Sequence, residues 1–169
     1  MPTPISHAAV GFAIAAWTQP GTPTPRVCIA AAACAALPDI DVIGGALHIS
    51  HASLFGHRAI THSITFALVG AMVASIAFFH GNRRIAFVLA LALLSHGCLD
   101  AFSTYSLGVE FFAPFSQQRF HFPWTPLRTG SEGLVDQLMQ EAIFVLLPAV
   151  LLGWVGIKIR RRAPPVNEM

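Results

Sequence analysis

The sequence predicts an all-α fold, a multi-pass transmembrane helical bundle of about four to five helices that forms one domain over residues 1–169. Composition is the first observation behind this prediction, because 54% of the residues are hydrophobic and only 11% are charged, against about 25% charged in soluble domains. The second is a mean hydropathy of +0.63, and the third is a series of five apolar stretches. This composition argues against a soluble cytosolic enzyme and against a disordered chain. A net charge of +2 without a basic face argues against nucleic-acid binding.

The five apolar stretches differ in length. A helix that crosses a bilayer needs about 17–25 apolar residues, so the third, fourth and fifth stretches are predicted to span the membrane. The first is too short, and the second is interrupted by the segment PDID at residues 38–41, so both are partial spans or helices packed inside the bundle. In chain order the stretches are residues 5–17, 27–47, 63–79, 85–102 and about 138–157.

Basic residues predict the orientation of the helices. Four of them lie within residues 158–162, directly after the fifth stretch, and Arg83 and Arg84 lie between the third and fourth. Because basic residues favour the cytoplasmic side, residues 158–169 are predicted to be a short basic cytoplasmic tail in a bacterial inner membrane. The loops 48–62 and 103–136 then lie on the extracytoplasmic side. Arg58, Arg119 and Arg128 do not follow the charge rule there, which makes them candidates for function.

Most histidines and several aspartates are predicted to meet at that extracytoplasmic end. A chance distribution would place them at both ends, so this one-sided grouping indicates a site. The residues that carry the prediction are His7, Asp39, Asp41, His57, His62, His96 and Asp100.

Two pairs within this group suggest metal ligands. His96 and Asp100 are four residues apart and share one helix face, and imidazole with carboxylate suits zinc or another divalent ion. Alternatively, Asp100 only orients His96. Asp39 and Asp41 would repel each other unless a cation lies nearby, although they could also form a solvated helix end. With a metal bound, either of them could act as a general base on a metal-bound water.

The loops around the group offer further candidates. His57 and His62 are five residues apart and converge if Thr61 caps the following helix. Arg58 could contact a substrate anion, or it could form an ion pair with Asp39 or Asp41. Loop 103–136 could cover the site with Arg119 and His121 facing inward, or its aromatic residues could serve as a membrane anchor. His48, His51 and His80 are interpreted as interfacial histidines.

Five motifs in this order resemble the YdjM-like family of predicted membrane-bound metal-dependent hydrolases, over about residues 5–125. The resemblance implies an inner-membrane protein that holds divalent metal through the seven histidines and aspartates named above. The order of ligands is more distantly similar to zinc-dependent phospholipase C, although a later HxxxE motif is missing. The motifs are an early Ser-His7, PDID (38–41), HRAITHS (57–63), HGCLD (96–100) and PFSQQRFHFPW (114–124).

The expected function is therefore that of a membrane-bound metal-dependent hydrolase, with zinc as the expected ion. It would cleave a phosphoester or other ester of lipid or envelope origin with a metal-activated water. Asp39, Asp41 and Arg58 are expected to be catalytic, and Arg58, Arg119 and His121 to bind substrate. The expected partners are the lipid bilayer and a lipid or phosphoester substrate, without nucleic acid. The alternatives are a transporter or metal-handling protein without hydrolase activity, and an inactive member that keeps the metal for folding.

Overall fold

The computed structural model describes residues 2–19, 21–50, 53–104, 107–128 and 133–162. Within these ranges the regular structure is helical, without strands, and two isolated bridges (Ser103 with Leu127, Val109 with Phe120) tie the long loop together. The elements are α1 (Pro4–Thr18), α2 (Pro25–Ala36), a 3₁₀ turn (Leu37–Val42), α3 (Ile43–Ala46), a second 3₁₀ turn (Ile60–His62), α4 (Ile64–Phe79), α5 (Arg83–Ala101), α6 (Leu134–Glu141), a π-helical turn (Ala142–Leu146) and α7 (Leu147–Arg162).

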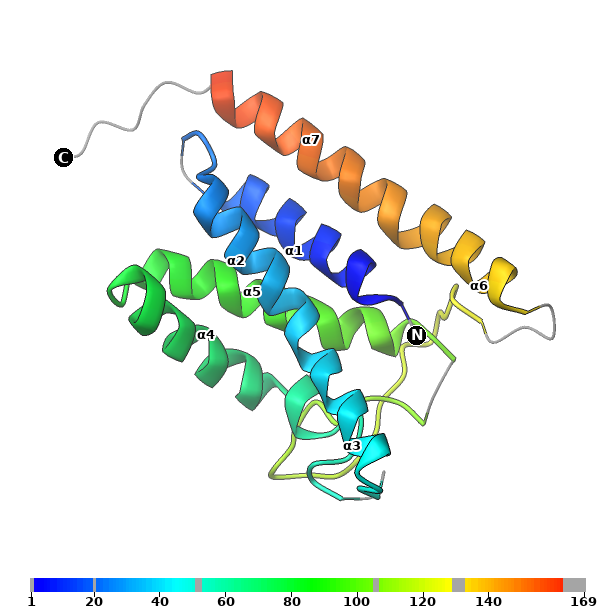
Figure 1. Ribbon diagram of the computed structural model, residues 1–169. Coiled ribbons are helices and arrows are strands. Elements are labelled where there is room, and N and C mark those ends of the chain that lie inside the picture. Colours follow the sequence, from blue (N-terminus) through cyan, green and yellow to red (C-terminus); the bar gives the residue numbers. More distant parts are fainter. Residues whose placement is uncertain (1, 20, 51–52, 105–106, 129–132, 163–169) are drawn as a thin grey trace.

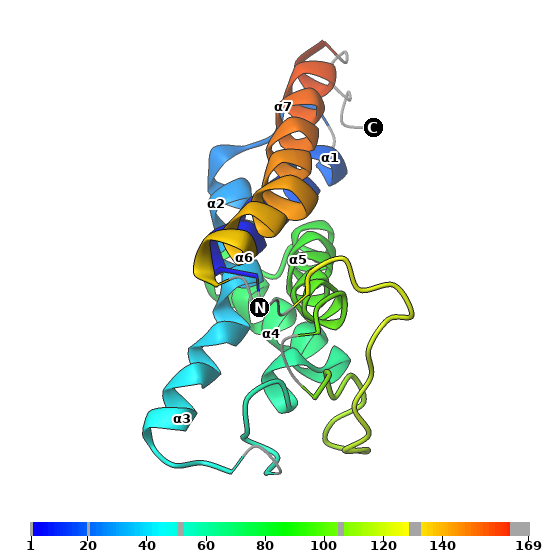
Figure 2. The same cartoon turned by 90° about the vertical axis from the view of Figure 1, so that its right-hand side faces the viewer.

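Five long helices build the described part of the chain, because α6, the π-helical turn and α7 follow one another without a break. Helix α1 packs against α2, α5 and α7, while α4 packs against α5. Figure 1 shows α7, α1, α5 and α4 in succession, with α2 crossing over α1 and α5. Figure 2, turned by 90°, shows the long loop beside α5. The predicted all-α bundle of four to five helices is confirmed.

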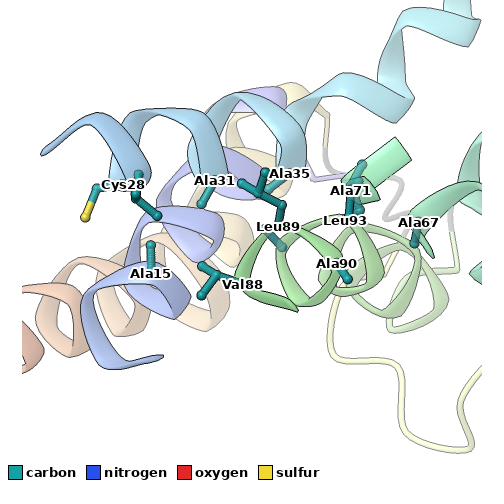
Figure 3. Packing of buried hydrophobic residues seen from close by; sticks show 12 residues of the cluster. Ala15, Cys28, Ala31, Ala35, Ala67, Ala71, Val88, Leu89, Ala90 and Leu93 are labelled. Atoms are coloured by element: carbon teal, nitrogen blue, oxygen red, sulfur yellow. The ribbon is translucent and has the colours of Figure 1, made fainter. Parts of the chain in front are cut away.

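Small side chains fill the space between these helices. The buried cluster contains seven alanines, among them Ala15, Ala31 and Ala71, with Leu89 and Leu93 as its largest members (Figure 3). Large apolar side chains such as Met72 on α4 and Trp154 on α7 are exposed instead. Membrane helices pack in this way, because lipid tails accept the large apolar side chains while small residues let the helix backbones approach.

Within the described part of the chain, two helices are long and apolar enough to cross a membrane, α5 with 19 residues and the continuous helix 134–161 with 28. Helix α4 has only 16 residues, which gives a length of about 24 Å, shorter than the hydrocarbon core of about 30 Å. The third apolar stretch, which the sequence predicts to span the membrane, therefore forms a helix shorter than the hydrocarbon core. Its first residue, Ser63, lies outside the helix as the N-cap and accepts a hydrogen bond from the Phe66 amide.

The two ends of the bundle differ in charge. The α1–α2 turn, the α4–α5 turn and the end of α7 lie at one end (Figure 1), where the Arg160 guanidinium donates to the Trp17 carbonyl and Arg26 Nη2 donates to the Phe78 carbonyl at 2.8 Å. We call this the basic end. The start of α1, the 3₁₀ turn after α2 and the end of α5 lie at the opposite end, which we call the cluster end.

A buried carboxylate fixes the start of α1 at the cluster end. Glu141 Oε1 accepts hydrogen bonds from the Thr3 amide at 2.6 Å and from the Thr3 hydroxyl at 2.5 Å. A negative charge at a helix N-terminus also interacts favourably with the helix dipole. Glu141 thereby joins the last long helix to the turn of α1 that carries His7.

Gly11 sets the distance between α1 and α2. A Cβ atom at this position would lie 2.4 Å from the Ala31 carbonyl oxygen and 2.6 Å from the Ala35 Cβ. We expect Gly11→Ala to push the helices apart and to lower the free energy of unfolding by about 1–3 kcal/mol, measured as thermal unfolding in detergent. Gly70→Ala is the matched control, because its Cβ would make ordinary van der Waals contacts, with Leu93 Cδ1 at 3.4 Å and Phe66 Cε1 at 4.0 Å. Equal stability of the two variants would contradict the close packing of α1 on α2.

Candidate metal centre

Four buried side chains converge at the cluster end. Asp39, His62, His96 and Asp100 each offer one ligand atom, and these four atoms lie within 4.8 Å of one another. They come from the 3₁₀ turn after α2, from the 3₁₀ turn before α4, and from the last turns of α5. Two imidazoles and two carboxylates form a donor set that fits zinc and related divalent ions. We call these residues the inner group.

Contacts within the inner group are short. His62 Nε2 lies 2.9 Å from His96 Nε2 and 3.2 Å from Asp100 Oδ2, and His96 Nε2 lies 3.5 Å from Asp39 Oδ1. His96 Nε2 and Asp100 Oδ2, one turn apart on α5, are separated by 3.9 Å. The predicted shared helix face of these two residues is confirmed.

Outer hydrogen bonds orient both imidazoles of the inner group. His96 Nδ1 lies 2.7 Å from the Ala35 carbonyl oxygen, which can only accept a hydrogen bond, so Nδ1 carries the proton. His62 Nδ1 lies 3.3 Å from Asp41 Oδ2, and a carboxylate partner likewise favours a proton on Nδ1. When both rings are neutral, each Nε2 presents a lone pair, and these lone pairs face each other. A proton or a metal cation between the two Nε2 atoms removes their repulsion.

The charge of the cluster also favours a cation. Asp39, Asp41 and Asp100 are buried, and Arg58 is the buried guanidinium among them, so two negative charges remain when the histidines are neutral. Both oxygens of Asp39 are buried without a hydrogen bond from any group in the described part of the chain. Buried carboxylates are costly unless they are paired or bind a metal. A divalent ion would balance the remaining charge.

Asp41 occupies a different position, outside the inner group. Its oxygens accept hydrogen bonds from His57 Nδ1 at 2.5 Å, from the Arg58 amide at 3.1 Å and from the Thr61 hydroxyl at 2.6 Å, besides the contact with His62. Burial raises the pKa of Asp41, but the hydrogen bonds from His57, His62 and Thr61 outweigh burial and hold that pKa well below its ordinary value. Asp41 therefore orients His57 and His62, where the sequence predicted a ligand or general base.

The segment between His57 and His62 brings the two histidines together through hydrogen bonds that the sequence did not predict. Thr61 does not cap α4, since Ser63 is the N-cap and the Thr61 hydroxyl binds Asp41. The two histidines nevertheless converge as expected, with ring centroids 5.7 Å apart. Burial lowers the pKa of His62, but its contacts with Asp100 and Asp41 outweigh burial and raise that pKa above its ordinary value.

Arg58 and His7 complete the buried part of the site. Arg58 is fully buried, and its Nε lies 2.9 Å from Asp100 Oδ2, so it forms an ion pair with Asp100 that the sequence did not predict. Its φ of 64° is left-handed, a strained conformation that is found often at functional sites. His7 stacks on His96 with centroids 3.8 Å apart, and its Nε2 lies 3.7 Å from Asp100 Oδ1.

The loop after α5 reaches the rim of the site. Arg119 Nη2 lies 2.9 Å from Glu110 Oε1, and Arg119 Nη1 donates to the carbonyls of Gly108 at 3.2 Å and His57 at 3.4 Å. Arg119 thus lies beside the cluster, as predicted. His121 does not face inward, because it is exposed and its Nδ1 lies 3.2 Å from the Ser103 carbonyl oxygen. Of the interfacial histidines, His48 and His80 lie at left-handed turn positions, and His51 is outside the described residues.

Three residues that support the site were missed by the sequence analysis. Gly97 lies where a Cβ would come within 2.8 Å of the His62 carbonyl oxygen, so its lack of a side chain lets the second 3₁₀ turn approach α5. Glu110 binds Arg119, and its amide donates to the Arg58 carbonyl at 3.1 Å. The sequence could have pointed to Glu141, because an acidic residue in an apolar stretch indicates a functional or structural partner. No sequence pattern singles out Gly97 or Glu110.

These features define an integral membrane helical bundle with a buried histidine–aspartate cluster at one end. The chain belongs to the YdjM inner membrane protein family, which matches residues 1–163. It is 34% identical over 167 residues to the inner membrane protein YbcI of Escherichia coli (strain K12), covering 90% of this chain and 95% of that protein. No solved structure matches the chain. The predicted family and the bacterial inner-membrane location are confirmed, while the similarity to phospholipase C stays a prediction.

Metal analysis tests the inner group directly. We expect the purified protein to bind a divalent ion, and Asp39→Asn and His96→Gln to abolish that binding because each removes an inner donor. Asp41→Asn should lower the metal affinity by about 10–100-fold, the effect of losing an outer carboxylate that orients a ligand. Bound metal is measured by mass spectrometry of the elements and affinity by competition with a chelator.

His121→Gln is the matched control for this experiment, because His121 is exposed and hydrogen-bonds to the Ser103 carbonyl. A protein that binds no divalent ion, or whose affinity is unchanged in Asp39→Asn and His96→Gln, contradicts the assignment.

Proposed function

We propose that this protein is a membrane-bound metal-dependent hydrolase that cleaves a phosphoester or another ester of lipid or envelope origin. The observation that carries the proposal is the inner group, four buried donors within 4.8 Å of one another beside two uncompensated negative charges. Asp39, His62, His96 and Asp100 would hold the ion, with zinc as the expected metal, and His7 lies next to them. When bound, such an ion lowers the pKa of a water molecule and polarises a carbonyl or phosphoryl oxygen.

The pair of His57 and Asp41 is our candidate for the proton acceptor. The side chain of His57 is 16% exposed, whereas those of His7, His62 and His96 are fully buried. Asp41 holds His57 through Nδ1, which favours proton transfer at Nε2. This assignment replaces Asp39 and Asp41 as general bases, because Asp39 belongs to the inner group and Asp41 already accepts several hydrogen bonds. Histidine is well suited to the task near neutral pH.

The two arginines would have different tasks. Arg58 is fully buried against Asp100, so it would stabilise the charge of the cluster and the position of that ligand. Arg119 lies at the rim with 16% of its side chain exposed, so it is the better candidate to bind a substrate anion. Guanidinium suits phosphate because it donates two parallel hydrogen bonds. A substrate phosphate would then compete with Glu110 for Arg119.

The orientation in the membrane is part of the same proposal. Most of the described basic residues lie at the basic end, with Arg58, Arg119 and Arg128 as the exceptions. The positive-inside rule would put the basic end in the cytoplasm. The cluster end then lies on the extracytoplasmic side, where it would meet lipid headgroups and envelope components. In this proposal the protein meets its substrate in the lipid bilayer.

Hydrolysis is tested with purified protein in mixed micelles that contain phospholipids or phosphate esters, with release of the product as the readout. We expect activity that requires the divalent ion. His57→Gln should lower kcat by about 100-fold or more, because a general base contributes about 10²–10⁴ to the rate, while the bound metal is retained. Arg119→Gln should mainly raise KM for a phosphoester.

Metal bound without turnover of any substrate in this panel would instead indicate a site that serves folding. Passage of the ion into sealed proteoliposomes, without hydrolysis, would indicate a transporter. Each of these outcomes contradicts the hydrolase while leaving the metal centre in place.

Orientation is tested separately with reporters fused to the C-terminus. We expect a reporter that is active only in the cytoplasm to be active, and one that is active only in the periplasm to be inactive, because the basic residues at the end of α7 favour the cytoplasm. The reverse result would place the cluster end in the cytoplasm.

A further inference from the structure

A cavity with a partly polar lining lies at the basic end, at the opposite end of α5 from the inner group. It has a volume of about 760 Å³ and lies between the α1–α2 turn and the first turns of α5. Its polar lining includes Arg83, Arg84, Asn82 and Thr22, and its apolar lining includes Phe87 and Val88. Nothing in the proposed hydrolase reaction uses this cavity.

The positive charge of this cavity is not balanced by the described part of the protein. Arg83 and Arg84 are exposed, and neither forms an ion pair with a described carboxylate. The described carboxylates all lie at the cluster end, three in the cluster itself and the others on the loop after α5 or on α6. Further basic residues lie on neighbouring helices, so the whole basic end attracts anions.

The cavity combines this charge with apolar surface. Val88 lines the cavity but is buried in the hydrophobic core, whereas its neighbour Phe87 on α5 is 60% exposed. Because α5 is long and apolar enough to span a membrane, we expect the exposed Phe87 side chain to lie beside the hydrocarbon of the bilayer. A lining that combines arginines with such an apolar side chain matches the border between a phosphate headgroup and its acyl chains.

We propose that this cavity binds the phosphate headgroup of an anionic phospholipid from the leaflet at the basic end. Arg83 and Arg84 contact the phosphate, the hydroxyl of Thr22 contributes hydrogen bonds, and an acyl chain lies along Phe87. The charge complementarity favours an anionic lipid over a zwitterionic one. The proposal is independent of the hydrolase, because the cavity and the inner group lie at opposite ends of α5.

The test uses the full chain in detergent, with phosphatidylglycerol, phosphatidylcholine or inorganic phosphate added as probes. Lipid binding is measured by native mass spectrometry, and thermal unfolding gives an independent readout. We expect phosphatidylglycerol to bind and to raise the Tm, and phosphatidylcholine to do so much less. The double variant Arg83→Gln/Arg84→Gln should bind phosphatidylglycerol roughly 30-fold more weakly, from about a fivefold contribution of each arginine near a lipid surface.

Arg161→Gln is the matched control, since Arg161 is an exposed arginine of the basic end that does not line the cavity. It should retain the wild-type affinity. Equal losses in Arg161→Gln and in either single variant, Arg83→Gln or Arg84→Gln, would indicate attraction by the whole basic end and would overturn the site. Equal binding of the two lipids would overturn it as well. Stabilisation by inorganic phosphate alone, equal to that by phosphatidylglycerol, would indicate a site for free phosphate.

Discussion

Burial of carboxylates at one end of an apolar bundle is the constraint on which the rest of the structure depends. An ionised carboxylate away from water is tolerated only when charge and hydrogen bonds compensate it. Asp41 meets this condition through donors from residues 57–62, and Asp100 is paired in charge with Arg58 at 2.9 Å. The oxygens of Asp39 and Asp100 nevertheless lack a hydrogen bond in the described part of the chain, and Asp39 faces His96 Nε2 at 3.5 Å. Compensation of the buried carboxylates is therefore incomplete beside the two inner imidazoles, and this coincidence is the physical basis of the proposed metal centre.

Small residues make this arrangement of side chains possible. The cluster combines residues from helices α1 and α5, from two 3₁₀ turns and from the loop before the second turn. Their polar atoms meet only if the backbones approach closely. Gly11 allows α1 to approach α2, and Gly97 allows the turn of His62 to approach α5. The Ala35 carbonyl can orient His96 because alanines separate α2 from α5. The packing that suits a membrane bundle therefore also sets the geometry of the site.

The sequence predicted the helices and the end at which the polar residues meet, because both follow from apolar stretches and their alternation. It also predicted the pair of His96 and Asp100, since a spacing of four fixes two side chains on one helix face. The partner of Arg58 and the role of Thr61 could not be predicted, because they depend on a turn with a left-handed residue that has no periodic signature. The role of Asp41 likewise depends on donors that lie 16 to 20 residues away along the chain.

Helix α5 links the two ends and explains why their chemistry stays separate. It carries Arg83 in its first turn and Asp100 in its last, a separation of 17 residues that corresponds to about 26 Å along the helix axis. A single helix thus holds the inner group near one end of the bundle and the proposed lipid-binding cavity near the other, whichever end faces the cytoplasm. A phospholipid in that cavity would have to travel this distance to reach the inner group. In this proposal, a lipid bound there is therefore a stabilising or regulatory ligand of the bundle and not a substrate in transit to the proposed metal centre.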